Sequence, residues 1–157
     1  FIWGPVHFFT VSSDPDEGPS LEPQREWLDS AMSAATAPWK LVYFHHPPYS
    51  PGGHGSQEFM QWPFEEWGAD AVLAGHDHLY ARGLKNEPDA IPYFICGLSG
   101  RTNIYDCDQP LSADEFDAIC YNEKNGAMKI TATPEDILFE FFVEGEESEV
   151  DSYMLEK

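Results

Sequence analysis

The sequence predicts an α/β fold, in which strands pair in parallel and a helix packs against them. Short apolar runs of β-branched and aromatic residues occupy positions 6–11, 40–44 and 71–74, and each is typical of a buried strand. Apolar residues also recur at helical spacing from Leu21 to Ala35, which indicates an amphipathic helix on the face of a sheet. Together these observations place a helix between strands.

The segment between the second and third strands supports the same fold. Residues 50–56 read as a flexible loop of Ser, Pro, Gly and His. Residues 59–67 carry large apolar side chains, which indicate a short helical segment within the core. Strand, helix and strand in this order favour a right-handed crossover and parallel pairing.

The second half of the chain predicts further strands. Residues 91–96 form an apolar run, and Gly97–Arg101 is a Gly-rich turn without the lysine and spacing of a phosphate-binding loop. The acidic stretch 144–151 is expected to be a solvated turn. Three closing antiparallel strands are expected at residues 126–133, 137–143 and 152–155.

Histidines gather where two of the predicted strands end. The run 41–44 stops at His45 and His46, and the run 71–74 stops at Gly75, before His76 and His78. In open α/β sheets, ligands bind at the carboxyl ends of strands. If the backbone stays extended past Gly75, His76 and His78 share one face, where they can hold one metal ion or two adjacent ones. For an isolated H-x-H, solvent-exposed histidines in a turn are the alternative.

These residues resemble the calcineurin-like metallophosphoesterases, and most closely the branch of purple acid phosphatases and related bacterial phosphatases. The resemblance implies that residues 1–157 are a single domain, the C-terminal half of a β-sandwich flanked by helices in the layer order α/β/β/α. It extends from about the start of the chain to its last strand. It rests, in chain order, on Gly4–Phe9, Gln24–Leu28, His45–Tyr49, His54 and Gly75–Tyr80.

The resemblance also implies a site and a reaction. His45 and His76 would bind one metal ion and His78 a second, the pair being drawn from Fe, Zn and Mn. His54 would stand near the phosphate, where it binds the phosphate or donates a proton to the leaving alkoxide. A metal-activated hydroxide would attack phosphorus in a phosphomonoester or phosphodiester. Residues expected to support the site, rather than to react, are His46, Asp77, Tyr80 and Arg82.

The sequence departs from the family pattern in one respect. The family's first half supplies D-x-H, G-D-x-x and G-N-H motifs, and no stretch of residues 1–157 matches them. We therefore expect an N-terminal half of the same domain upstream of Phe1, and a segment that is inactive by itself. Two other interpretations stay open. One is a non-catalytic phosphatase-like module in a larger assembly, and the other is a mononuclear zinc hydrolase with three histidine ligands.

The composition limits the classes of partner that the chain is expected to bind. The chain has 28 Asp and Glu against 8 Lys and Arg, a net charge of −20, which argues against binding to nucleic acid or to anionic membranes. No apolar run has the length of a membrane span. Cys107 and Cys120 can pair if the protein is exported, and relatives of the family imply a secreted or periplasmic location. The sequence carries no signal for an oligomeric state.

Overall fold

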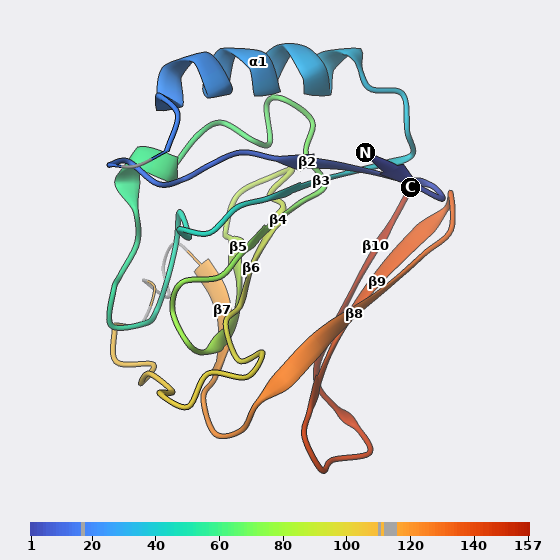
Figure 1. Cartoon of the computed structure of the whole chain (residues 1–157). Helices are drawn as coiled ribbons and strands as arrows, with labels where there is room; N and C mark the ends of the chain where they lie inside the picture. Colours follow the sequence, from blue (N-terminus) through green and yellow to red (C-terminus); the bar gives the residue numbers. More distant parts are fainter. Residues whose placement is uncertain (17, 110, 112–115) are drawn as a thin grey trace.

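The structure, a computed structural model, describes residues 1–16, 18–109, 111 and 116–157. Its strands are β1 (Ile2–Trp3), β2 (Val6–Thr10), β3 (Trp39–Tyr43), β4 (Ala71–Ala74), β5 (Tyr80–Lys85), β6 (Pro92–Cys96), β7 (Phe116–Tyr121), β8 (Gly126–Ala132), β9 (Asp136–Val143) and β10 (Glu149–Glu156). Within the described residues they form a seven-stranded sheet in the order β1-β2-β3-β4-β6-β5-β7 and a three-stranded sheet in the order β10-β9-β8. Figure 1 shows the smaller sheet set against one side of the larger.

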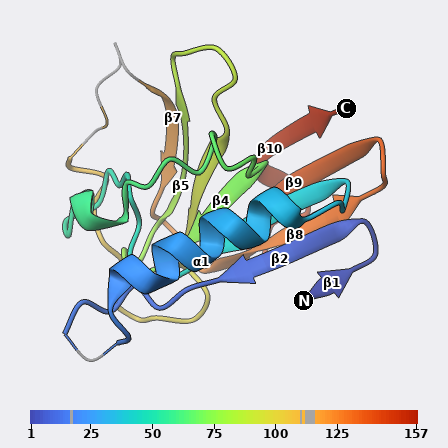
Figure 2. The same cartoon turned by 90° about the horizontal axis from the view of Figure 1, so that it is seen from above.

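The centre of the larger sheet is parallel, as predicted. β2 pairs with β3, β3 with β4 and β4 with β6, all in parallel. Helix α1 (Leu21–Ala34) connects β2 to β3 and lies across these strands (Figures 1 and 2). Its apolar residues Leu28 and Met32 are fully buried against Phe9 and Val42 of the sheet. The predicted amphipathic helix and the α/β fold are therefore confirmed.

The other face of the larger sheet packs against β9. Residues of β9 alternate between buried and half-buried along the strand, which is the pattern of a strand with one face in a core. Phe139 stacks on Phe94 of β6 at 4.7 Å between ring centroids, and Phe141 stacks on Tyr80 of β5 at 4.0 Å. Helix, sheet and sheet are three of the four layers expected, and the described residues form these three.

Three strands were not predicted, namely β1, which pairs antiparallel with β2, and β5 and β7. β5 and β7 pair antiparallel with each other, and β5 also pairs antiparallel with β6 at the end of the larger sheet. The sequence of β5, Tyr-Ala-Arg-Gly-Leu-Lys, has no apolar run, although its first four residues are buried. The helical segment expected at 59–67 is only a 3₁₀ turn at Glu58–Met60, although Met60 and Phe64 are buried as predicted.

A buried ion pair joins the two sheets. Arg82 of β5 donates from Nε to Oδ2 of Asp151 in β10 (2.8 Å) and from Nη2 to Oδ1 (3.2 Å), and Tyr80 donates to Oδ2 (2.7 Å). The prediction that the acidic stretch 144–151 is solvated is therefore wrong at Asp151, which is 7% exposed. The expectation that Tyr80 and Arg82 support the structure agrees with these contacts. Among the helices that the structure describes, none has the length and apolar character needed to cross a bilayer.

Candidate metal centre

Two neighbouring strands end at the same edge of the larger sheet, and histidines follow each. β3 ends at Tyr43, two residues before His45, and its parallel neighbour β4 ends at Ala74, two residues before His76. The Gly75 N–H donates to the His45 carbonyl oxygen (3.0 Å), which continues the pairing beyond the strands. The histidines therefore meet at the carboxyl ends of parallel strands, as the sequence predicted.

The turn that carries His76 is not the extended backbone that the sequence predicted. His76 has a φ of 69°, in the left-handed region that residues other than glycine rarely adopt. The Asp77 N–H donates back to the Gly75 carbonyl oxygen (2.9 Å), so a tight turn replaces the strand. The expected division of side chains still results, because His76 and His78 line one hollow while Asp77 is fully buried. Backbone strain of this kind is concentrated at functional sites.

The imidazoles of His45 and His76 are close enough to share one ion. Nδ1 of His76 lies 3.2 Å from Nε2 of His45. Two nitrogen ligands of a tetrahedral zinc ion would be roughly 3.4 Å apart, if each Zn–N bond is about 2.1 Å long. Ring nitrogens of His45, His46 and His76 all lie within 4.8 Å of one another. This donor set fits a transition-metal ion that accepts imidazole.

His46 belongs to this cluster, but its hydrogen bonds favour a supporting role. Oγ of Ser13 accepts from the backbone N–H groups of His45 (3.1 Å) and His46 (2.9 Å). Its lone pairs are then engaged, so its O–H donates to Nδ1 of His46 (3.0 Å). A neutral His46 consequently carries its proton on Nε2, which leaves no nitrogen lone pair for a metal. The structure brings His46 to the centre, and Ser13 fixes how it is oriented there.

His78 is oriented for a separate position. Its Nδ1 lies 2.7 Å from the carbonyl oxygen of Asn103, so Nδ1 carries the proton and Nε2 keeps a free lone pair. The ring stacks on Tyr105, with centroids 4.5 Å apart and planes 12° from parallel. His78 stands outside the close group formed by His45, His46 and His76. The arrangement allows His78 to serve a second ion beside the first.

His54 reaches the same hollow from the loop that precedes the 3₁₀ turn. Its ring centroid lies 4.3 Å from that of His76 and 5.1 Å from that of Tyr105. The four predicted site residues line this hollow together with Arg101 and Tyr105. The structure therefore brings all four together. The complete lining is His45, His54, Gly75, His76, His78, Gly97, Arg101 and Tyr105.

Burial and neighbouring charges favour the neutral form of the two candidate ligands His45 and His76. Burial first, and then the charges of His46, His54 and His45, lower the pKa of His76 to about 4. Burial, followed by the charges of His46 and His78, also lowers the pKa of His45. The neutral imidazole is the form that binds a metal ion, so these two side chains hold free lone pairs at neutral pH.

Comparison with known proteins finds a similar family. Residues 4–80, just under half of the chain, match the family model described as calcineurin-like phosphoesterase. The chain is similar to this superfamily over these residues. A comparison with curated proteins finds no match.

Solved structures share the fold of this chain. The purple acid phosphatase PPD1 of yellow lupin (Lupinus luteus) has a TM-score of 0.77 over 98% of this chain, at 18% identity. GAP50, described as the anchor in the inner membrane complex of Plasmodium, has a TM-score of 0.66 over 96% of the chain, at 13% identity. PhoD has a TM-score of 0.56 over 85% of the chain, at 17% identity. The chain spans 31%, 49% and 31% of these proteins, respectively.

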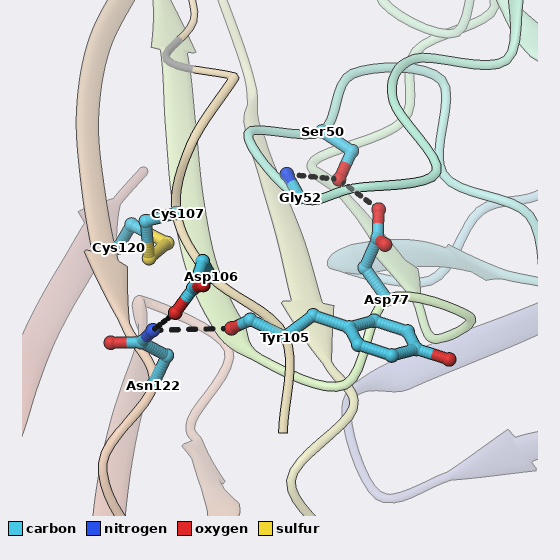
Figure 3. The surroundings of a disulfide bond; sticks show 8 residues. All are labelled: Ser50, Gly52, Asp77, Tyr105, Asp106, Cys107, Cys120 and Asn122. Atoms are coloured by element: carbon cyan, nitrogen blue, oxygen red, sulfur yellow. Dashed lines mark hydrogen bonds between the residues drawn. A yellow bond between two sulfur atoms is a disulfide. The ribbon is translucent and has the colours of Figure 1, made fainter. Parts of the chain in front are cut away.

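Residues of the segment 101–107 complete the candidate metal centre, and sequence reasoning missed them. Arg101 and Tyr105 line the hollow, and Asn103 orients His78. The disulfide between Cys107 and Cys120, which the sequence left open, ties the end of this segment to β7 (Figure 3). Nδ2 of Asn122, the residue directly after β7, also donates to the Tyr105 carbonyl oxygen (3.2 Å) and to Oδ1 of Asp106 (3.3 Å). The Gly-rich turn at residues 97–101 was the available signal, but it did not indicate a place beside His78.

The close group of candidate ligands is neutral in the part of the chain that the structure describes. The close group of potential ligands there contains His45, His46 and His76 and no carboxylate. Two divalent ions held only by imidazoles would keep their full charge at short separation. Further, negatively charged ligands are therefore required before two ions could be held tightly.

Proposed function

We propose that this chain is the C-terminal part of a metal-dependent phosphoesterase with a dinuclear site, which hydrolyses phosphomonoesters or phosphodiesters. The observation that carries the proposal is the 3.2 Å separation between His76 Nδ1 and His45 Nε2 at the strand ends. His78 and His54 line the same hollow, which gives room for a second ion and for a substrate. The match of residues 4–80 to the calcineurin-like phosphoesterase model supports the reaction class.

Each histidine has a distinct part in this proposal. His45 and His76 would hold one ion, and His78 would hold the other through Nε2, with Fe, Zn or Mn as candidates. When bound, the ions would activate water for attack on phosphorus and offset the charge that develops on the phosphate oxygens. His54 would stand beside the phosphate in the same hollow, where it would bind the phosphate or donate a proton to the leaving alkoxide.

We also propose that the missing carboxylate ligands come from an N-terminal half of the same domain. The relatives of known structure are two to three times as long as this chain, since it spans 31% to 49% of them. At the edge formed by β1, β2 and β8, a groove is lined by Phe1, Trp3, Phe8 and Ile130. Trp3 is 78% exposed there, and further strands of the domain would cover it. By this proposal the chain alone hydrolyses nothing.

The environment of the protein is a related proposal. Disulfides persist in secreted and periplasmic proteins, so the Cys107–Cys120 bond supports an exported protein. The net charge of −20 would repel an anionic ester, and only the local charge of the bound ions would attract it.

The test uses the full-length protein and p-nitrophenyl phosphate. Replacement His76→Ala should abolish hydrolysis and lower the metal content, because the variant lacks one of the two proposed ligands of the first ion. The matched control is His7→Ala, since His7 lies in β2, stacks on Phe9 and takes no part in the hollow. Hydrolysis that withstands both His76→Ala and a chelator would defeat the proposal.

A second candidate function is a non-catalytic module in a larger assembly. The observation in its favour is the shared fold of GAP50, which is described as an anchor and matches 96% of this chain. The all-histidine ligand group is the second observation. The residues upstream of Phe1 decide between the candidates. Intact D-x-H and G-N-H motifs there would favour the enzyme, and degenerate motifs would favour the module.

A mononuclear zinc hydrolase remains the third candidate, and metal analysis separates it from the others. If the 157-residue chain binds one zinc ion stoichiometrically and hydrolyses the ester by itself, the site is complete without upstream ligands. If the chain is inactive and binds zinc weakly, the dinuclear proposal is favoured.

A further inference from the structure

A fully buried carboxylate lies beneath the loop that carries His54. Asp77 sits between His76 and His78 in sequence, and its side chain is turned away from the hollow, with 0% exposure. Oδ2 accepts a short hydrogen bond from Oγ of Ser50, and Oδ1 accepts from the backbone N–H of His54 (3.1 Å). Figure 3 shows Ser50 directed at the Asp77 carboxylate.

The loop is folded closely around this carboxylate. The Gly52 N–H donates to Oγ of Ser50 (3.1 Å), so the loop backbone and the Ser50 hydroxyl form one network with Asp77 (Figure 3). A Cβ atom at Gly52 would stand 2.5 Å from Cγ of Asp77, which no side chain can tolerate without displacement. Ser50, Gly52 and His54, three alternate residues of one loop, therefore all contact Asp77.

The free energies of burial and of hydrogen bonding explain why Asp77 orders the loop. A carboxylate removed from water is costly unless it accepts hydrogen bonds, and bonds to a charged acceptor are about twice as strong as neutral ones. The loop, in contrast, contains Gly52, Gly53 and Gly55, which favour many backbone conformations when free. The bond that the His54 N–H donates to Asp77 therefore helps to select one conformation of the loop. It acts beside bonds such as those from the Gly55 N–H to the Gly52 carbonyl oxygen (2.9 Å) and from Gln109 Nε2 to the Gly53 carbonyl oxygen (3.2 Å).

We infer that Asp77 is a positioning residue for His54. Through the backbone N–H of His54 it holds that ring 4.3 Å from the ring of His76, beside the candidate ligands. Because Asp77 belongs to the turn that also carries His76 and His78, one side chain couples the placement of the ligands to that of the proton donor. This inference rests on the proposed function for its catalytic consequence, but its structural part stands without it.

The experiment compares two esters in the full-length protein. A p-nitrophenolate leaves without a proton, whereas an alkoxide needs one, so only the alkyl phosphate depends on His54 in its role as proton donor. Asp77→Ala should lower kcat for an alkyl phosphate by about tenfold or more, a part of the 10²- to 10⁴-fold that a general acid contributes. Its kcat for p-nitrophenyl phosphate and its metal content should stay within about twofold of wild type. Asp77→Asn keeps an oxygen for the His54 N–H and should rescue part of the loss.

Three further variants sharpen the result. In Asp77→Ala combined with His54→Ala, the loss should equal that of His54→Ala alone, because both act through one ring. Ser50→Ala leaves the carboxylate in place and should give a smaller loss of the same kind. Asp70→Asn is the matched control, since Asp70 accepts the Lys40 N–H (2.6 Å) at the opposite end of β4 and should change neither ester.

Hydrogen exchange of the His54 amide separates failure of this inference from failure of the proposed function. Asp77→Ala should speed that exchange by at least about tenfold, and Asp70→Asn should not. Unchanged exchange would overturn the inference, as would equal loss on both esters. If no ester is hydrolysed by the wild type, the proposed function fails, while the exchange rate still decides whether Asp77 holds the loop.

Discussion

Replacing Asp151 should destabilise the fold strongly, because the change leaves Arg82 buried without its counter-ion. The side chains of Arg82 and Asp151 are 8% and 5% exposed, and their closest N–O distance is 2.8 Å. At an effective dielectric constant of about 20, this separation corresponds to an attraction of about 6 kcal/mol. Removal of both charges from water offsets much of that attraction, so the intact pair contributes little net stability.

Loss of one partner is a different matter. Asp151→Ala leaves a guanidinium and the Tyr80 hydroxyl buried without acceptors, and breaking such a pair costs about 3–5 kcal/mol. For a chain of this size, each kcal/mol lowers the melting temperature by about 2–4 °C, so we expect a decrease of about 6–20 °C. Combining Asp151→Leu with Arg82→Met should cost less than Asp151→Ala, because no charge then remains buried.

Calorimetry and urea unfolding measure these effects, and Lys129→Ala is the control. Lys129 and Glu140 form an ion pair at the same distance of 2.8 Å, but Lys129 is 62% exposed, so its loss should cost less than about 1 kcal/mol. An Asp151→Ala variant that loses no more stability than Lys129→Ala would refute the reasoning, as would a double variant that is no better than the single one.

The pH dependence gives an independent check. Burial would raise the pKa of Asp151, but hydrogen bonds from Arg82 and Tyr80 outweigh burial and hold the pKa below its ordinary value. The unfolded chain has a pKa of about 3.9 at this residue. The stability that the carboxylate contributes is thus complete above about pH 4 and is lost as the pH falls through the lower pKa of the folded state. The stability difference between wild type and Asp151→Asn should stay constant from pH 7 to about pH 5 and shrink on further acidification.

Three other predictions concern the loops and the thiols. Reduction of Cys107–Cys120, which are 13 residues apart, should lower the free energy of unfolding by about 3 kcal/mol, as measured by urea titration with and without a reductant. Gly97→Ala should destabilise the fold by at least about 2 kcal/mol in thermal melting, because its Cβ would lie 1.8 Å from the Asp77 carbonyl oxygen. Burial raises the pKa of the Cys96 thiol to about 12, so Ellman's reagent at pH 8 should react with it only after denaturation.

Local patterns in the sequence predicted the part of the site that depends on neighbours along the chain. His45 and His76 follow apolar runs that end abruptly, and parallel pairing of those runs is enough to bring the two side chains together. Asn103 and Tyr105 gave no such signal, since their place beside His78 depends on the Cys107–Cys120 bond and on β7. Contacts between residues more than 20 positions apart depend on the whole fold, so the composition around either residue does not predict them.

Asp151 illustrates the same limit from the opposite direction. Acidic residues surround it in sequence, so composition predicted a solvated turn. It lies instead in β10 and accepts hydrogen bonds from Arg82 and Tyr80, which precede it by 69 and 71 residues. A charge in an acidic run is normally solvated unless a cation reaches it. Here Arg82 reaches it from another sheet, and that pairing could not be read from either segment alone.

The segment 76–82 connects the candidate site to the loop of His54 and to the second sheet. His76 and His78 face the hollow, Asp77 between them holds the loop of His54, and Tyr80 and Arg82 are bonded to Asp151 of the second sheet. A site keeps its geometry when the residues next to its ligands are themselves fixed by packing and hydrogen bonds. Disturbance of the Asp151 contacts should therefore reach the candidate ligands through two residues of β5, whereas disturbance of Asp77 should reach His54 first. The two substitutions thus distinguish loss of the scaffold from loss of the proton donor.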